Sequence, residues 1–261
     1  MFGIRCRRVI SRVRHMITEF VPIKPYCIKS DQGLVSFTFD DIPHTAAAAG
    51  GAILSRHGVA GTYYVCGGLT GAKEQGIPCH SRADLEALAR DGHELGVHTF
   101  RHLSVPSLSK TEFDHEAHES DAFIRSIVAG AQVASFAYPF GRCNLRSKRW
   151  AAKRYATARG ISPGFNEGWT DLAQLKAVPL YSGRIDEAGV RAMVKQAIAR
   201  KAWLIFYTHD VSDSPSPYGC TAALLETAVH HATVLGACIL PVKSALDAIA
   251  AGRHKLPRVH G

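Results

Sequence analysis

The feature that most constrains the fold is an alternation that begins at residue 34 and continues almost to the end of the 261-residue chain. Short segments rich in Val, Ile, Phe and Tyr alternate with stretches of helical length that are rich in Ala, Leu, Glu and Arg. This alternation is typical of β/α units. It predicts strands at residues 35–39, 61–65, 94–98, 135–138, 155–159, 177–181, 203–208 and 238–241. It predicts helices at residues 45–56, 82–90, 110–127, 146–154, 187–200, 222–235 and 243–251.

The chain is predicted to be an α/β protein with one main domain. Its length fits a single α/β barrel, and a content of 46% apolar and 20% charged residues indicates a packed core. No repeat or Pro-rich linker divides it, so the one predicted boundary separates a basic arm, residues 1–30, from a domain of residues 31–261. The seven cysteines include no C-x-x-C pair and are expected to be mostly reduced and buried.

The basic arm contributes to a net charge of +9 and leaves several partners open. A net positive charge favours binding to nucleic acid, to an anionic membrane surface, or to a glycan or lipid substrate that carries phosphate. No DNA-reading motif is present, which disfavours nucleic acid. Apolar residues between positions 9 and 20 line one face of a possible helix, so peripheral contact with an anionic membrane is weighed against a solvated arm. The arm has no apolar run typical of a secretion signal, which favours a cytoplasmic protein, and association of the arm with the inner membrane is left open.

Ionisable residues follow several of the predicted strands. Asp40 and Asp41 end the first strand, and His98, Arg159 and His209 end or follow three others. The carboxyl ends of parallel barrel strands meet on one rim, where catalytic groups lie. The sequence therefore predicts one site that contains these side chains.

A metal site is the first chemistry that this pattern favours. His98 and His102 are four residues apart, and with Asp41 they form a set of two imidazoles and one carboxylate. Three such ligands leave coordination positions open, as a catalytic metal requires. The alternatives are that the histidines form an ordinary polar face and that the aspartates open a turn before Pro43.

Four segments, in order, resemble the motifs of one enzyme family. FTFDD at residues 37–41 resembles the first motif of polysaccharide deacetylases of the NodB-homology (carbohydrate esterase) type, and HTFRH at 98–102 is similar to their second motif, His-[Ser/Thr]-x-x-His. FAYPFG at residues 136–141 resembles the third motif, and LIFYTH at 204–209 the fifth. The resemblance extends over about residues 34–250 and implies a distorted (β/α) barrel of seven to eight parallel strands.

The resemblance also implies a ligand set and a cofactor. Asp41, His98 and His102 would bind a divalent metal, with Zn²⁺ as the default and Co²⁺, Ni²⁺ or Mn²⁺ as alternatives. Tyr138 and Pro139 of the third motif are expected to contact the substrate.

The catalytic roles that the resemblance implies agree with the chemistry of the residues. Asp40 would be the general base that accepts the proton of the attacking water, and His209 the general acid that protonates the leaving amine. Because Pro139 has no N–H, the amide of Phe140 is the predicted oxyanion donor. His44, three residues beyond Asp41, is expected to border the substrate.

The sequence departs from the family at two motifs. The third motif often begins with an Arg that pairs with the base, and this segment contains no Arg; Arg159 is predicted to replace it, against the alternative of an ordinary surface residue. The fourth motif, an Asp-Trp pair whose Asp orients the acid histidine, has no match. Asp171 or Asp186 is the expected substitute.

The predicted activity is hydrolytic removal of an N-acetyl group from an amino sugar of a bacterial surface polysaccharide. A cytoplasmic enzyme would act on a precursor, which suggests O-antigen, capsule or lipooligosaccharide assembly. Two alternatives remain: removal of a formyl or acetyl group from a small lipid-linked sugar, and a catalytically silent glycan-binding protein. The second alternative is disfavoured because Asp40 and His209 accompany the full ligand set.

Overall fold

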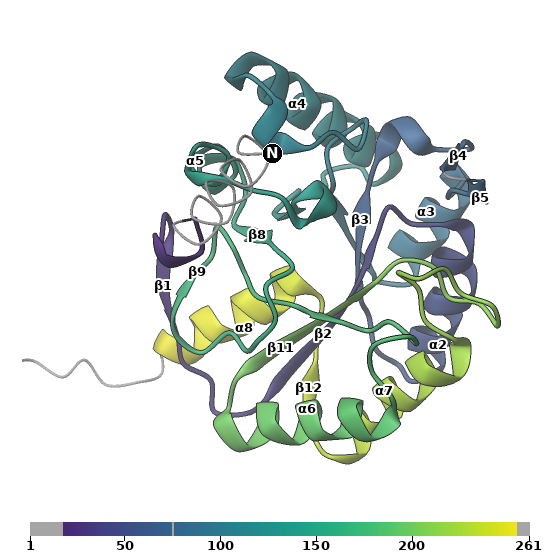
Figure 1. Ribbon diagram of the computed structural model, residues 1–261, viewed down its shortest axis with the longest axis vertical. Coiled ribbons are helices and arrows are strands. Elements are labelled where there is room, and N and C mark those ends of the chain that lie inside the picture. Colours follow the sequence, from purple (N-terminus) through teal and green to yellow (C-terminus); the bar gives the residue numbers. More distant parts are fainter. Residues whose placement is uncertain (1–17, 75, 255–261) are drawn as a thin grey trace, which may run out of the picture.

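The core of the fold is a curled half-barrel of parallel strands (Figure 1). A computed structural model describes residues 18–74 and 76–254. Seven strands follow one another in the order β10-β11-β2-β3-β6-β7-β8. Their bounds are β2 (Leu34–Asp40), β3 (Thr62–Val65), β6 (Glu94–Val97), β7 (Ser135–Ala137), β8 (Thr157–Arg159), β10 (Val178–Pro179) and β11 (Trp203–Thr208). The α/β class and the distorted barrel predicted from the sequence are confirmed.

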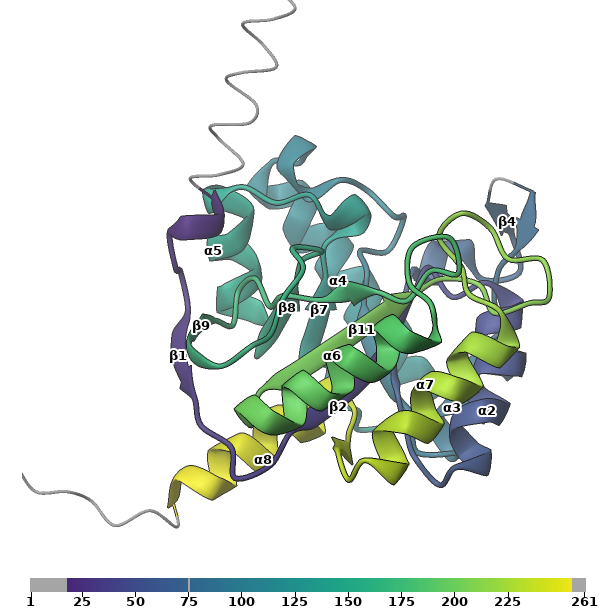
Figure 2. The same ribbon diagram turned by 60° about the horizontal axis from the view of Figure 1, so that its bottom comes forward.

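Helices surround the strands, and in both views α6 runs along the outside of β11 and β2 while α7 lies between α6 and α2 (Figures 1 and 2). The predicted helix at 45–56 is divided into a π-helical turn, Ala46–Gly50, and α2. Ser81 and Ser109 cap α3 and α4 in capping boxes. The helix bounds are α2 (Gly51–Arg56), α3 (Arg82–Arg90), α4 (Lys110–Ile127), α5 (Leu145–Arg154), α6 (Glu187–Arg200), α7 (Ala222–Val234) and α8 (Val242–His254).

Strand β2 lies inside the sheet between β11 and β3, and all seven of its residues are buried. Its polar residues alternate with apolar ones, and the buried hydroxyls of Ser36 and Thr38 donate to the carbonyl oxygens of Leu240 and Phe206. Along one edge, β12 (Cys238–Ile239) pairs with the beginning of β2, while β3 pairs with its end. Two strands thus share one edge of β2, which distorts the barrel and directs Asp40 and the loop after it toward the open rim.

The described end of the predicted arm, residues 18–28, contacts the barrel. Strand β1 (Pro25–Ile28) pairs antiparallel with β9 (Gly168–Asp171). The buried Lys148 ammonium donates to the carbonyl oxygens of Thr18 and Val21 and lies 2.7 Å from the Asp171 carboxylate. Residues 18–28 are therefore anchored to the barrel. The predicted basic helical face lies mostly outside the described residues.

A short two-stranded hairpin lies outside the main sheet. The hairpin of β4 (Lys73–Glu74) and β5 (Ile77–Pro78) was not predicted, and it lies at the rim of the barrel (Figure 1). The six cysteines in the described part of the chain are free thiols, and four of them are buried. No helix within residues 18–74 and 76–254 is long and apolar enough to cross a membrane.

Candidate active site

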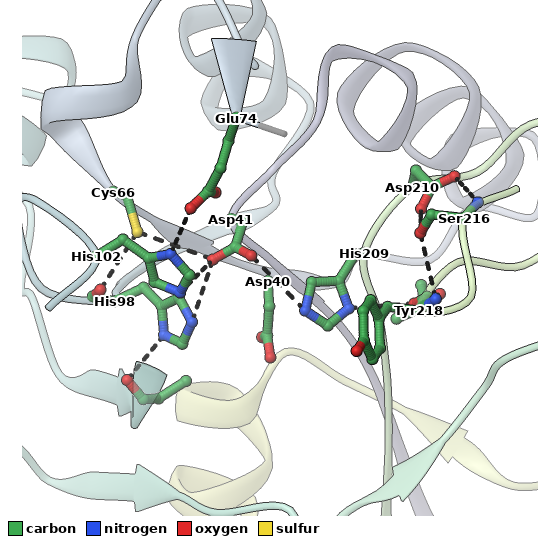
Figure 3. Close-up of polar contacts among 12 residues, drawn as sticks. Asp40, Asp41, Cys66, Glu74, His98, His102, His209, Asp210, Ser216 and Tyr218 are labelled. Carbon is green, nitrogen blue, oxygen red and sulfur yellow. Dashed lines mark hydrogen bonds and ion pairs between the residues drawn. The ribbon is translucent and has the colours of Figure 1, made fainter. Parts of the chain in front are cut away.

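The predicted site residues meet in one cleft at the carboxyl ends of the strands. The cleft has a volume of about 530 Å³, and its lining includes Asp40, Asp41, His98, His102 and His209. Asp40 ends β2 and Asp41 follows it, the two histidines follow β6, and His209 follows β11. Figure 3 shows Asp41 with His98 and His102 on one side and His209 on the other. The convergence expected of parallel strand ends is therefore observed.

Asp41, His98 and His102 form a compact set of ligand atoms. The Asp41 Oδ1 atom lies 3.3 Å from His98 Nε2 and 3.1 Å from His102 Nε2. One donor atom from each of the three residues falls within 4.8 Å of the others. Two imidazole nitrogens and a carboxylate oxygen at this spacing fit a divalent transition metal that keeps open coordination positions.

The outer nitrogens of both histidines are held by acceptors. His98 Nδ1 lies 2.9 Å from the carbonyl oxygen of Ala137, and His102 Nδ1 lies 2.8 Å from Glu74 Oε1 on the β4–β5 hairpin. Because each Nδ1 atom faces a hydrogen-bond acceptor, the imidazole proton lies on Nδ1. The Nε2 atom, which is directed toward Asp41, then carries a free lone pair. Burial lowers the pKa of His98 to about 3, which keeps its imidazole neutral as a metal ligand must be.

Backbone strain is concentrated around the same atoms. Asp41, Thr99, His102 and Phe140 have φ between 57° and 59°, in the left-handed region that non-glycine residues rarely adopt. Such conformations cost on the order of 1–3 kcal/mol each and cluster at functional sites. At Gly141, next in the chain, a Cβ atom would lie 2.2 Å from Ile161, so only glycine fits there. The strained loop conformations place the side chains of Asp41, His102 and Phe140 at the cleft.

Asp40 forms a buried ion pair with Arg159, whose side chain enters from β8. The Arg159 Nη2 atom donates to both carboxylate oxygens, at 2.5 Å for Oδ2, and both residues are at most 4% exposed. The guanidinium carbon lies 5.1 Å from the ring centre of Tyr64 and 5.0 Å from that of Tyr207. Burial favours the neutral acid, but the facing guanidinium outweighs it, so the pKa of Asp40 is lowered and the carboxylate is ionised.

His209 reaches the cleft with its Nε2 atom. That atom lies 3.7 Å from Asp41 Oδ2, while Nδ1 lies 3.1 Å from the carbonyl oxygen of Tyr218. The carbonyl is an acceptor, so it fixes the ring with a proton on Nδ1 and leaves Nε2 facing the site. The substitutes suggested by the sequence are wrong, because Asp186 caps α6 and Asp171 binds backbone amides near residue 23.

Three residues predicted to contact substrate are not among those that line the cleft. The His44 ring is exposed and lies 3.0 Å from the Asp84 carboxylate on α3. The Tyr138 side chain is buried, and its hydroxyl donates to the carbonyl oxygen of Ala173. Pro139 is buried as well, and the third motif reaches the cleft through Phe140, whose ring centre lies 4.4 Å from that of His102.

Sequence reasoning missed Glu74 and Tyr218. Glu74 is one acid in a glycine-containing loop, and it gives no signal until the β4–β5 hairpin brings it to His102. Tyr218 acts through its backbone oxygen, which every residue type carries, so no side-chain pattern marks it. Ser216 and Asp210 hold that loop, since the Ser216 amide donates to Asp210 Oδ2 at 2.8 Å.

Two imidazoles and a carboxylate at the carboxyl end of a parallel barrel are typical of barrel hydrolases. The chain belongs to the polysaccharide deacetylase family, since the sequence model of that family matches residues 28–158. The family consists of hydrolases that act on C–N amide bonds. The matched residues include Asp40, Asp41, His98 and His102 but end before Arg159 and His209, so the placement of those two rests on the structure. No curated protein matched the chain.

Solved structures show the same fold at low sequence identity. A structure described as T48 deacetylase with substrate is 20% identical, with a TM-score of 0.59 over 85% of this chain and 92% of that one. A peptidoglycan N-acetylglucosamine deacetylase is 15% identical, with a TM-score of 0.61 over 84% and 91%. A family 4 carbohydrate esterase pseudoenzyme from Bacillus anthracis is 16% identical, with a TM-score of 0.59 over 87% and 69%. The barrel therefore occurs in enzymes and in a pseudoenzyme.

Proposed function

We propose that this protein is a metal-dependent deacetylase that hydrolyses the N-acetyl group of an amino sugar. One observation carries the proposal: a base, an acid and a three-residue ligand set face the same cleft. Asp40 is ionised and held by Arg159, and His209 lies across Asp41 from the two ligand histidines. A pseudoenzyme or glycan-binding protein would require neither the base nor the acid.

The roles of the residues follow from their positions. Asp41, His98 and His102 would hold the divalent ion, with Zn²⁺ the default. When bound, such an ion polarises an acyl oxygen and lowers the pKa of water. Asp40 accepts the proton of the attacking water, a role open to it because its carboxylate is ionised. His209, when both of its ring nitrogens carry a proton, gives the Nε2 proton to the departing amine nitrogen and keeps the one on Nδ1, and the Phe140 amide is the oxyanion donor.

The substrate that we propose is an N-acetylated amino sugar in a bacterial surface polysaccharide or its precursor, such as O-antigen, capsule or lipooligosaccharide. A related fold in a peptidoglycan N-acetylglucosamine deacetylase supports a substrate of the amino-sugar class. A cytoplasmic location and contact of the basic arm with the inner membrane belong to the same proposal, and they suit a lipid-linked precursor.

The proposal is tested with purified protein and N-acetylglucosamine oligosaccharides. We expect about one divalent ion per chain by elemental analysis, and release of acetate that stops with a chelator and returns with Zn²⁺. Formylated sugars in parallel identify the acyl group by the acid released. Full activity in metal-free protein, or no acyl release from any amino sugar by metal-loaded protein, contradicts the proposal.

His209→Gln separates the acid from the ligand set. We expect kcat to fall by about 10²- to 10⁴-fold, since a positioned proton donor contributes that much. Metal content should stay near one ion per chain, because His209 is not part of the set. His230→Gln, a change at an exposed histidine of α7 that does not line the cleft, is the matched control. Wild-type turnover in His209→Gln would make His209 a structural residue.

A further inference from the structure

Two arginines line the cleft without a role in the chemistry above. Arg142 follows the Pro139–Gly141 turn, and Arg184 lies between β10 and α6. Neither belongs to the ligand set or to the Asp40 pair. Both side chains are exposed to solvent, so their guanidinium groups are accessible to a ligand in the cleft.

Aromatic rings of the site support both guanidinium groups. The Arg142 guanidinium carbon lies 5.8 Å from the ring centre of Phe140, which itself contacts His102. The Arg184 guanidinium carbon lies 5.7 Å from the ring centre of Tyr181, whose ring lies 6.0 Å from that of His209. Cation–π contact at these distances orients a guanidinium and leaves its N–H groups free to donate. One arginine is thus adjacent to the ligand side of the cleft and the other to the acid side.

The acidic side chains of the cleft have polar partners on the protein, whereas the two arginines have no carboxylate partner among the described residues. Asp40 pairs with Arg159, Glu74 with His102, and Asp210 with Ser216. Within residues 18–74 and 76–254, no carboxylate lies within 4.0 Å of a nitrogen of Arg142 or Arg184. The cleft therefore presents two arginine side chains that contact aromatic rings and have no carboxylate partner in the described part of the chain.

We infer that the amino-sugar substrate carries an anionic group, a phosphate or a carboxylate, which Arg142 and Arg184 bind. This inference rests on the proposed deacetylation and adds the charge of its substrate. The planar guanidinium forms paired, charge-assisted hydrogen bonds with either anion. A phosphate would come from a nucleotide- or lipid-linked sugar and a carboxylate from a neighbouring acidic sugar, so the ligands in the test distinguish the two.

The test compares binding and turnover of three sugars by metal-loaded protein. These are N-acetylglucosamine, N-acetylglucosamine 1-phosphate, and a disaccharide of N-acetylglucosamine and glucuronic acid. We expect calorimetric Kd and kcat/KM to favour at least one anionic sugar by about tenfold or more. In the double variant Arg142→Gln/Arg184→Gln, the ratio between the anionic and the neutral sugar should fall toward one. The control is Arg125→Gln/Arg191→Gln, which removes two exposed charges from α4 and α6 and should keep the ratio.

The outcomes separate this inference from the proposed function. Equal binding and turnover of all three sugars overturns the inference while leaving deacetylation in place. A preference that survives in the Arg142→Gln/Arg184→Gln variant also overturns it, because the anion would then be bound elsewhere, for instance by the metal. If no sugar is hydrolysed, the proposed function fails, and the binding ratio alone still decides whether the arginines select an anion.

Discussion

Asp40→Asn is expected to lower kcat by about 10²- to 10⁴-fold while the protein keeps its metal and its affinity for substrate. The reason is that Asp40 is the proposed base, and a positioned base contributes a rate factor of this size. Its carboxylate faces Arg159 rather than the histidines, so its loss removes no metal ligand. Metal content and turnover measured across a metal titration check the prediction, and added metal should not restore the rate.

Asp41→Asn is the matched comparison, because the two aspartates are neighbours in the chain. Asp41 Oδ1 is close to Nε2 of both His98 and His102, so a neutral amide there weakens metal binding. Its activity should therefore recover in part with excess metal. The division of roles is wrong if Asp40→Asn is rescued by metal or if both variants lose metal equally.

Arg159→Met is expected to destabilise the fold by about 3–5 kcal/mol, the usual cost of leaving one partner of a buried ion pair without the other. Asp40 and Arg159 are both buried, so water cannot replace the lost partner. Denaturant unfolding of the metal-free proteins measures the loss. Arg200→Met is the control: its pair with Glu167 is about half exposed, and such pairs contribute about 0–1 kcal/mol.

A double variant identifies the pair as the cause. Asp40→Asn/Arg159→Met removes both charges and should be more stable than Arg159→Met, because no ionised group is then left buried without a counter-charge. If the double variant loses the sum of the two single losses, the two side chains are not coupled, and Arg159 stabilises the barrel through packing against Tyr64 and Tyr207 alone.

The sequence predicted the elements whose signals are local or periodic. All eight predicted strands and the parallel barrel are present, because short apolar segments between helical stretches can be recognised locally. The grouping of Asp41, His98 and His102 was predictable for a different reason. Parallel strands end on one rim, so residues at strand ends converge without knowledge of the loops.

What the sequence did not predict depends on contacts between distant segments. His44 follows Asp41 by three residues, yet the left-handed backbone at Asp41 and Ile42 turns the chain so that His44 meets Asp84 instead of the cleft. Glu74 and the Tyr218 carbonyl reach the histidines through a hairpin and a loop whose paths no periodic pattern encodes. The pairing of residues 25–28 with β9, 140 residues or more along the chain, is likewise invisible to a local pattern.

The Asp40–Arg159 pair joins β2 to β8, two strands that are separated in the sheet by β3, β6 and β7. The proposed base is therefore also one half of an ion pair that connects two distant strands through the interior of the half-barrel. Natural selection for catalysis and selection for foldability would act on the same two positions. A homologue that lost Asp40 alone would keep a buried guanidinium without a counter-charge. Evolution from enzyme to pseudoenzyme at this site would therefore either lower the stability of the fold or include a second substitution at residue 159.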